Sequence, residues 1–180
     1  MQPDRISLFS YAHLPERFAA QSKFNDSMLP DAELKALLYN TAVNSFKKIG
    51  YEMIGLDHFA KANDTLAIAK NGGVLHRNFQ GYTTHGNSDL LGIGVSSIST
   101  IGNAFAQNPK ELKAYYARID EKQHTATIGL SLTKDDLIRR DVISSLMCNL
   151  HVNKTAIEKK HHIVFDDYFE DALDALSSLV

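Results

Sequence analysis

The sequence predicts an α/β fold that passes into helices toward its end, and three observations support this prediction. Residues 5–10 alternate between apolar and polar side chains, which is the pattern of a half-buried strand. A helical pattern over residues 31–49 leads directly into a strand-like run at residues 51–56, and this helix-then-strand order builds α/β barrels. From residue 133 onward the remaining patterns are helical.

The first helix has clear start and stop signals. Pro30 and Asp31 open it, because proline suits the first turn and aspartate can cap free backbone amides. Gly50 stands where the C-terminal glycine of a helix belongs. Apolar and small side chains between these signals recur at helical spacing, at Leu34, Leu37, Leu38, Thr41, Ala42, Phe46 and Ile49.

The next segment is predicted to combine a loop, a short helix and a strand. The run Asp57-His58-Phe59-Ala60 follows the strand over residues 51–56, and ligand sites of α/β folds gather beyond the carboxyl ends of parallel strands. Asn63 or Asp64 is expected to cap a short helix that ends near Gly72. Residues 79–84 are predicted to form the next strand.

The stretch from residue 75 to residue 99 is the most informative part of the chain, because glycine, histidine, arginine and aromatic residues are concentrated in it. Glycine at this density favours sharp turns or a close approach to a ligand. We predict a strand over residues 89–95, then a continued strand or a short helix over residues 96–101. The pair Gly92-x-Gly94 is a weak dinucleotide signal, and it equally fits two glycines that ease a strand past neighbouring backbone.

The second part of the chain contains several helix-start signals. The run Asn108-Pro109-Lys110-Glu111 offers a cap, a proline in the first turn and an acid at the third position. Thr133 is expected to cap a helix over residues 134–149, Thr155 to start a further turn or two, and Asp166 to precede a last helix. The acid pairs at these starts are interpreted as favourable charges near helix N-termini rather than catalytic carboxylates.

Composition excludes several classes of protein. The 180 residues carry a formal net charge of −2 without a basic stripe, which argues against a nucleic-acid partner. No apolar run is long enough to cross a bilayer, so we expect no membrane partner. The single cysteine, Cys148, cannot form an intrachain disulfide and is predicted to be a small buried apolar residue, and we expect a cytoplasmic location.

Four separate motifs carry a resemblance to a known family. In order and approximate spacing they resemble the bacterial oxygen-independent coproporphyrinogen III oxidases, which are radical S-adenosylmethionine enzymes of haem synthesis. The motifs are Arg5-Ile6-Ser7-Leu8-Phe9-Ser10-Tyr11-Ala12-His13-Leu14-Pro15, Gly50-Tyr51 with Ile54 to Ala60, Leu75 to Thr84 with Asp89 to Ser99, and Asp135 to Ile143. The resemblance covers nearly the whole chain and weakens after about Leu150.

The resemblance implies the fold, the activity and the cofactors. The chain is expected to be the later part of a partial TIM-like radical-enzyme barrel, over residues 1–107, and the beginning of a small helical C-terminal domain, over residues 108–180. The implied reaction converts coproporphyrinogen III to protoporphyrinogen IX without oxygen. It uses S-adenosylmethionine, a [4Fe-4S] cluster and an unidentified electron donor.

The three-cysteine motif that holds such a cluster is absent from this sequence. We therefore expect the chain to be a fragment whose missing motif lies upstream, and to be inactive by itself. Two alternatives stay open: a haem-binding, haem-trafficking relative of the radical enzymes, and a non-catalytic truncated remnant.

The resemblance also implies site residues. The positions matching Ala12 and Ile98 contact S-adenosylmethionine in the family, so these two residues are expected to line one nucleoside-sized cleft. No catalytic residue and no metal ligand is expected here, since His13, His58, His76 and His85 lack metal-ligand spacing. The substrate has four propionate carboxylates, for which Arg77 offers a bidentate fork and His58 or His76 a single donor.

Overall fold

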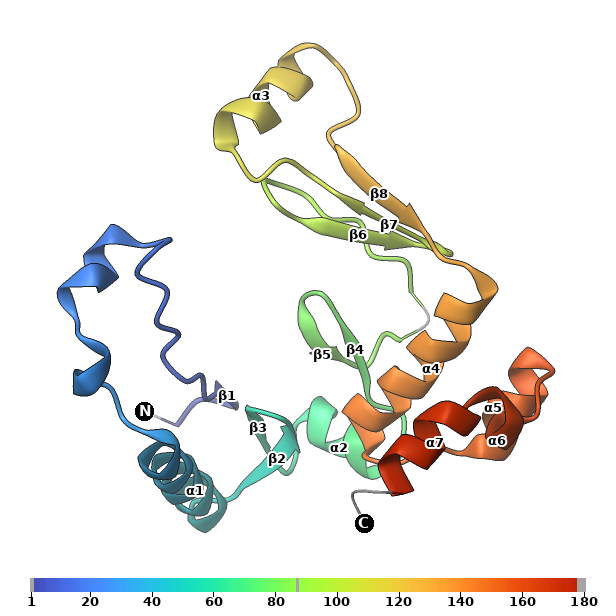
Figure 1. Cartoon of the computed structure of the whole chain (residues 1–180), viewed down its shortest axis with the longest axis horizontal. Helices are drawn as coiled ribbons and strands as arrows, with labels where there is room; N and C mark the ends of the chain where they lie inside the picture. The colour runs from blue at the N-terminus through green and yellow to red at the C-terminus, as the bar shows by residue number, and fades with distance from the viewer. Residues whose placement is uncertain (1, 87, 178–180) are drawn as a thin grey trace. The chain divides into compact units, whose positions relative to one another are not determined.

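The structure is a computed structural model that describes residues 2–86 and 88–177 (Figure 1). Contacts within the chain divide it into two compact units, one ending at Val74 and the other beginning at Leu75. Each unit combines helices with small antiparallel sheets, so the mixed α/β class is confirmed. Among the described residues all pairings between named strands are antiparallel, and the expected barrel stays a prediction.

The first unit is built on a three-stranded sheet in which β3 (His58–Lys61) lies between β1 (Arg5–Ser7) and β2 (Tyr51–Gly55). Leu56 and Asp57 form the turn of the β2–β3 hairpin, and Leu56 has a φ of +47°. The predicted strand over residues 51–56 is therefore confirmed. The loop expected after it is wrong from His58 onward, because the chain reverses there and pairs with both neighbouring strands.

Helix α1 (Ala32–Lys48) confirms both predicted signals. The Asp31 carboxylate accepts a hydrogen bond from the Leu34 amide at 2.8 Å, and Gly50 follows the end of the helix. Only Val43 of this helix is buried, where it packs with Tyr51 and Phe59. The helical spacing of the sequence thus marks more apolar positions than this unit covers, and the exposed ones include Leu34, Leu37, Leu38 and Ile49.

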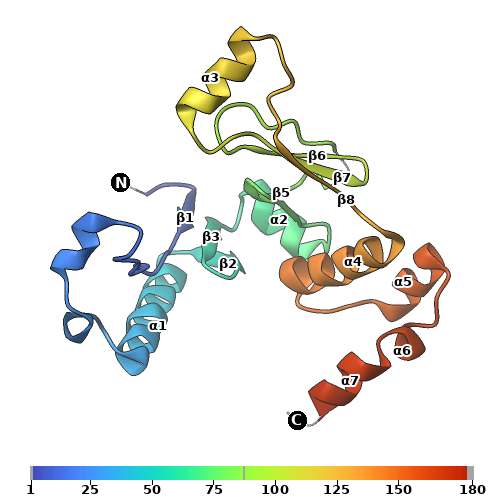
Figure 2. The same ribbon diagram turned by 45° about the horizontal axis from the view of Figure 1, so that its top comes forward.

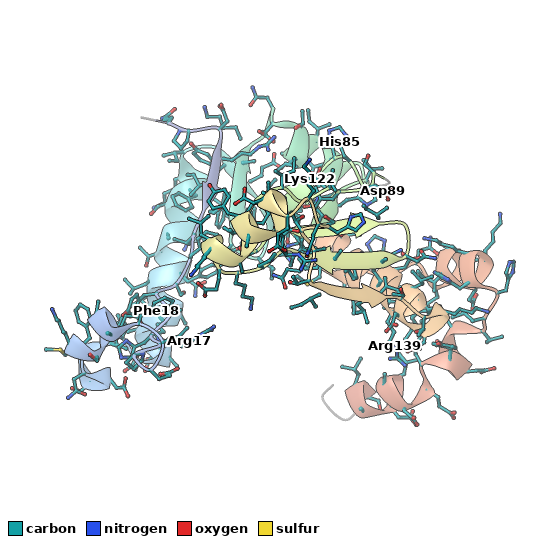
Figure 3. All side chains as sticks on the ribbon, turned by 90° about the horizontal axis from the view of Figure 1, so that it is seen from above. Arg17, Phe18, His85, Asp89, Lys122 and Arg139 are labelled. Atoms are coloured by element: carbon teal, nitrogen blue, oxygen red, sulfur yellow. The ribbon has the colours of Figure 1, made fainter. Side chains whose placement is uncertain are left out.

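Three further short helices belong to this unit. Asp64 caps α2 (Thr65–Asn71), as predicted. Two single-turn helices, η1 (Ala19–Lys23) and η2 (Asp26–Met28), lie in the long connection between β1 and α1 and were not expected from the sequence. Figure 3 shows Arg17 and Phe18 on this connection, where more than half of the Phe18 side chain is exposed.

The second unit begins with a hairpin. Strand β4 (His76–Asn78) pairs with β5 (Gly81–Thr83), so the strand predicted over residues 79–84 is confirmed only in its second half. Phe79 lies in the turn, and its ring meets that of Phe105 edge-on at 5.4 Å between centroids.

A three-stranded sheet follows, formed by β6 (Ile98–Ile101), β7 (Ala104–Gln107) and β8 (Ile128–Ser131) in that order (Figures 1 and 2). The strand predicted over residues 89–95 is wrong: only Leu90 forms a bridge there, to Thr100. Of the two alternatives left open for residues 96–101, a strand or a short helix, the strand is found, as β6 over Ile98–Ile101.

The link between β7 and β8 holds α3 (Leu112–Asp120), which begins later than predicted. Glu111, not Asn108, occupies the residue before the helix, and it makes no side-chain cap. Asn108 is instead buried, because its amide is hydrogen-bonded to other parts of the unit.

Four helices end the described chain: α4 (Lys134–Asn149), α5 (Lys154–His161), α6 (Phe165–Tyr168) and α7 (Glu170–Ser177). Thr133 and Asp136 form a reciprocal capping box at α4, which confirms the predicted start. Asn153, rather than Thr155, caps α5. Arg139, labelled in Figure 3, pairs with Asp135 at 2.8 Å, as acid-to-base spacing along a helix predicts.

Buried side chains hold these helices together. Ile138 of α4, Ile157 of α5 and Phe165 of α6 form one apolar cluster. This helical region agrees with the expectation of a helical C-terminal part. The predicted division between residues 107 and 108 concerns the complete protein and stays a prediction. Within residues 2–86 and 88–177, no helix is long and apolar enough to span a membrane.

One polar cluster joins α4 to α5. The Asp141 carboxylate lies 2.6 Å from the Lys160 ammonium and 2.7 Å from His161 Nε2. Burial of Asp141 acts to raise its pKa, but the hydrogen bonds from Lys160 and His161 outweigh it and hold the pKa below its usual value. The His161 side chain is 10% exposed and makes this contact with Asp141.

We expect Asp141→Asn to lower the free energy of unfolding by about 1–3 kcal/mol at pH 7, the usual value for a hydrogen bond to a charged group. A lowered pKa gives stability that is complete above the unfolded value of about 4 and is lost as pH falls through the folded value. The difference between the two proteins should therefore shrink in acid. Urea denaturation followed by circular dichroism at several pH values measures it. Asp174→Asn, at an exposed position in α7, is the control.

Candidate functional site

The segment before β6 is a loop, hereafter the glycine loop (residues 89–97), that lies against the strand it leads into. Two backbone hydrogen bonds of 2.8 Å join Leu90 to Thr100. At the start of the loop, the Asp89 carboxylate accepts a 2.8 Å hydrogen bond from the Gly102 amide. The loop therefore lies alongside β6, next to the backbone of Ile98.

Gly92 makes the closest approach in the glycine loop. Its amide donates to Ser99 Oγ at 2.9 Å. A Cβ at this position would stand 2.9 Å from the carbonyl carbon and oxygen of Ile98 and 3.0 Å from its nitrogen. Real side chains do not reach such distances, so only glycine permits the loop to lie against the Ile98 peptide. The second sequence interpretation, glycine passing neighbouring backbone, describes this geometry, although in a loop rather than a strand.

Gly94 has a different constraint. Its φ is +98°, a conformation that side-chain-bearing residues rarely adopt. Its amide donates to the Tyr115 hydroxyl of α3 at 3.2 Å, and its carbonyl accepts from the Asn108 side chain at 2.9 Å. Both glycines are thus required by backbone geometry, and neither provides a side chain for packing.

The residues between and beside the glycines point their apolar side chains outward. Leu91 is 70% exposed, Ile93 83% and Val95 37%. Apolar burial of these side chains within the described chain therefore contributes little to the shape of the loop. Polar contacts must determine it instead.

Ala12 lies in a second loop, in the first unit. The Gln21 side chain of η1 closes this loop, since its Nε2 donates to the Ala12 carbonyl at 3.1 Å and its Oε1 accepts from the Leu14 amide at 2.6 Å. Ala12 itself is exposed. The sequence analysis did not identify Gln21, because a single glutamine nine residues away gives no local signal.

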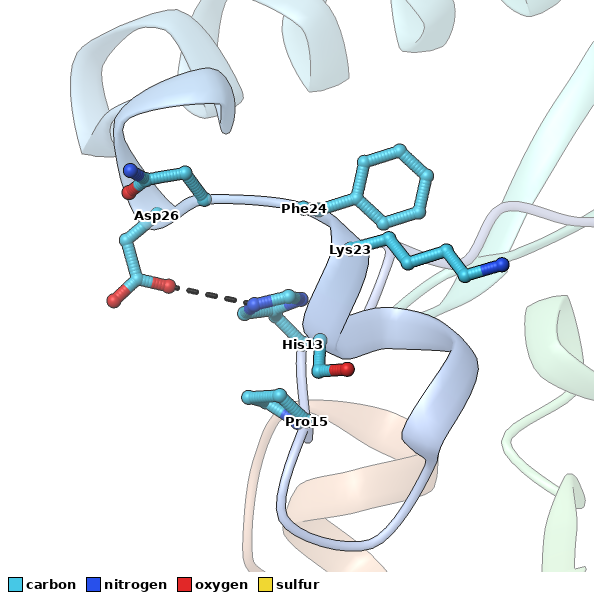
Figure 4. Close-up of a pocket in the computed structure, with 7 residues that line it drawn as sticks. His13, Pro15, Lys23, Phe24 and Asp26 are labelled. Carbon is cyan, nitrogen blue, oxygen red and sulfur yellow. Dashed lines mark ion pairs between the residues drawn. The ribbon is translucent and has the colours of Figure 1, made fainter.

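A shallow pocket lies beside Ala12, and Figure 4 shows it in close-up. The pocket measures about 420 Å³. Two of its lining residues face each other, with His13 Nε2 3.4 Å from Asp26 Oδ1. The Lys23 side chain lines another part of it. Ala12 is not among the lining residues, and its neighbour His13 is.

Ala12 and Ile98 belong to the two separate units. Because the placement of one unit against the other is not determined, the single cleft expected between them stays a prediction. Within its own unit, each residue follows or adjoins a loop that side-chain amides hold closed.

The three predicted substrate-binding residues occupy strands. His58 is at the start of β3, where its Nδ1 lies 2.7 Å from Asp57 Oδ1 and its ring meets Phe9 edge-on at 6.0 Å. His76 and Arg77 are consecutive on β4, and successive side chains of a strand point to opposite faces. His76 and Arg77 therefore do not share one face of the hairpin.

Arg77 is the more accessible of the two β4 residues. Its guanidinium carbon lies 5.5 Å from the centroid of the Tyr82 ring, and the side chain has no acidic partner among the described residues. The His76 ring is covered, because a Cβ on Gly86 would stand about 2 Å from it. Their roles toward a substrate stay predictions.

The chain is not suited to holding an iron–sulfur cluster. No group of three or more histidine, cysteine, aspartate or glutamate side chains converges within the described ranges 2–86 and 88–177. Cys148 is buried in α4, as expected, and burial raises the pKa of its thiol. A buried protonated thiol is a poor metal ligand.

We expect Gly92→Ala to lower the free energy of unfolding by about 1–3 kcal/mol, because the added methyl group overlaps the Ile98 peptide. Gly129→Ala is the matched control on the same sheet: there the nearest atom, the Phe105 carbonyl oxygen, is 3.5 Å away. Urea denaturation of the two variants measures the difference. Equal stability of both would contradict the close packing of the loop.

The amino-acid sequence was compared with those of known proteins. No family model matches the chain. The chain is 50% identical over 179 residues to the oxygen-independent coproporphyrinogen III oxidase of Salmonella typhimurium, 51% identical to that of Escherichia coli and 45% identical to that of Synechocystis. In each case the match covers 99% of this chain and 39% of the relative. The chain thus spans about two-fifths of the length of these relatives.

A solved structure agrees with the sequences. The chain superimposes on coproporphyrinogen III oxidase from Escherichia coli, a radical S-adenosylmethionine enzyme, with a TM-score of 0.94 and 50% identity. The superposition covers 99% of this chain and 41% of that one. The resemblance is thereby confirmed: in sequence and in backbone, this chain corresponds to one part of the oxygen-independent coproporphyrinogen III oxidases.

Proposed function

We propose that the chain supplies one part of an enzyme that converts coproporphyrinogen III to protoporphyrinogen IX without oxygen. The observation that carries this proposal is the TM-score of 0.94, at 50% identity and over 99% of the chain, with an enzyme named for this substrate.

The cofactors belong to the same proposal. S-adenosylmethionine and a [4Fe-4S] cluster supply the redox chemistry when they are bound, and the protein supplies binding and orientation. The residues present do not fit the cluster, because the only cysteine is buried. We therefore assign the cluster ligands to residues outside this chain and assign no catalytic residue within it. The chain alone is expected to be inactive.

Toward S-adenosylmethionine, Ala12 and Ile98 are suited to line an apolar surface for the nucleoside. A small side chain at Ala12 and an aliphatic one at Ile98 pack against a flat base while neighbouring backbone groups donate or accept hydrogen bonds. Both residues are only partly covered in their own units, which leaves them available for such contacts.

Toward the substrate, Arg77 is the best-placed of the three proposed residues. A guanidinium binds a carboxylate through two parallel hydrogen bonds, and the propionates of the porphyrinogen are carboxylates. Arg77 is exposed and lies against Tyr82. His58 and His76 remain proposed as single donors.

The setting completes the proposal. The chain works in the cytoplasm as the later part of a radical-enzyme barrel, residues 1–107, joined to the beginning of a helical domain, residues 108–180. Its partners are coproporphyrinogen III and an electron donor of unidentified nature, with no nucleic acid and no membrane.

A chimera tests the function. This chain replaces the 179 matching residues of the Escherichia coli relative, and the purified chimera is assayed without oxygen for protoporphyrinogen IX. We expect product formation, and none from the isolated chain. Binding of haem without product would favour the haem-trafficking alternative. A chimera that does not fold would also count against the proposal, because the superposition requires the two backbones to be interchangeable.

In that chimera, we expect Arg77→Leu to raise KM for coproporphyrinogen III by about 10- to 100-fold, the worth of one charge-assisted carboxylate contact. Arg77→Lys keeps the charge and loses the fork, so an intermediate value is expected. Arg139→Leu removes an exposed arginine of α4 and serves as the control. An unchanged KM in Arg77→Leu would exclude the residue from substrate binding.

A further inference from the structure

We propose that Asn108 is a positioning residue for cofactor binding: its buried side chain holds the glycine loop, and through it the surroundings of Ile98, in the shape that contacts S-adenosylmethionine. The inference rests on the proposed function for the identity of the ligand. It extends that function to a residue that touches neither substrate nor cofactor.

The Asn108 side chain contacts the glycine loop at the Gly94 carbonyl and the Ser97 hydroxyl, and more distantly, at 3.5 Å, at the Gly92 carbonyl. Its Nδ2 donates to the Gly94 carbonyl at 2.9 Å and lies 2.9 Å from Ser97 Oγ. Ser97 Oγ in turn donates to the Gly94 carbonyl at 2.7 Å. The three groups form a closed triangle of hydrogen bonds across the loop.

The backbone beside Asn108 reinforces the same contact. Its amide donates to the Ser97 carbonyl at 3.0 Å, and the next carbonyl, that of Pro109, accepts from the Ser96 amide at 2.8 Å. Gln107 and Ile98 are cross-strand partners at the ends of β7 and β6. Asn108 and Ser97 therefore stand opposite each other one step beyond the sheet, directly before Ile98.

Burial makes these bonds matter. Asn108 is 6% exposed, and among the described residues it is the one polar residue that is buried. A hydrogen bond made by a buried donor is costly to lose, because water does not readily take the place of the missing group. Removing the Asn108 amide leaves the Gly94 carbonyl dependent on Ser97 alone.

Apolar packing does little to fix the shape of the loop, so its hydrogen bonds determine it, and those of the Asn108 side chain join Gly94 to Ser97. Gly92 and Gly94 contribute no side chains, and Ile93 is directed to solvent. Glycine has the largest conformational freedom to lose, so a glycine-rich loop needs specific contacts to stay in one conformation. Because Gly92 lies against the Ile98 peptide, a loop that moves changes what surrounds Ile98.

A role as helix cap does not account for Asn108. Helix α3 begins at Leu112, and the Asn108 amide is occupied by groups 11 and 14 residues before it in the chain. A buried amide that joins separate points of a glycine-rich loop is instead suited to preorganising a binding surface, which lowers the entropy lost on binding.

The test compares Asn108→Ala with Asn103→Ala in the chimera. Asn103 is the same residue type, exposed in the β6–β7 turn of the same sheet. Equilibrium dialysis measures the Kd for S-adenosylmethionine, and steady-state kinetics measure KM for each substrate. We expect Asn108→Ala to raise the Kd for S-adenosylmethionine by about tenfold while KM for coproporphyrinogen III stays within about twofold, because the loop loses its hydrogen bonds from the Asn108 amide. Asn103→Ala should match the parent.

Two further variants guard against a simple loss of folding. Asn108→Asp keeps the shape but presents a carboxylate to the Gly94 carbonyl, so its affinity should fall at least as far as that of Asn108→Ala. Ser97→Ala removes one corner of the triangle and keeps Asn108, so a smaller rise in Kd is expected. If Asn108→Ala does not fold, the Kd of Ser97→Ala for S-adenosylmethionine decides: an unchanged value overturns the inference.

The outcomes separate this inference from the proposed function. The inference is overturned if a folded Asn108→Ala protein binds S-adenosylmethionine like the parent. It is also overturned if the Kd for S-adenosylmethionine and the KM for coproporphyrinogen III rise by the same factor. A chimera without oxidase activity overturns the proposed function. The positioning role would survive that result if Asn108→Ala still weakened S-adenosylmethionine binding, because dialysis does not depend on turnover.

Discussion

The glycine loop can lie against β6 only because no side chain stands between Gly92 and the Ile98 peptide. Two residues further along the loop, the Gly94 carbonyl accepts a hydrogen bond from the Asn108 side chain. The Gly94 amide donates one to the Tyr115 hydroxyl. The loop consequently ties β6, β7 and α3 together. Its apolar side chains face outward and add little to this arrangement, and the hydrogen bonds therefore carry the shape of the proposed cofactor-contacting surface.

The two units share one way of building a loop beside a residue that we propose contacts S-adenosylmethionine. In the first unit, the Gln21 side chain bonds to the Ala12 carbonyl and the Leu14 amide and so closes the loop around His13. In the second unit, the Asn108 amide performs the corresponding work before Ile98. A primary amide suits this purpose because it has both donors and an acceptor and no charge that burial would penalise.

In the proposed enzyme, the ligands of the iron–sulfur cluster are assigned to residues outside this chain. The one cysteine is buried, and within residues 2–86 and 88–177 no group of three or more side chains that could hold a metal ion converges. The Asp141 cluster between α4 and α5 is structural, because both of its partners, Lys160 and His161, belong to α5, and the same two helices pack through Ile138 and Ile157. The chain is thus suited to shaping a site whose reactive groups are supplied by other residues.

Local signals determined much of the fold: Asp31, Asp64 and Thr133 cap the helices that the sequence predicts, and the motif order identifies the family. The errors arose where a pattern had two physical solutions. The apolar residues that alternate with Gly92 and Gly94 led to the prediction of a strand, and Asn108-Pro109 led to the prediction of a helix start. Neither pattern shows which distant groups its residues will contact. Only the tertiary structure decided these cases, since the Ile98 peptide and the Gly94 carbonyl are brought to them by the pairing of β6 with β7.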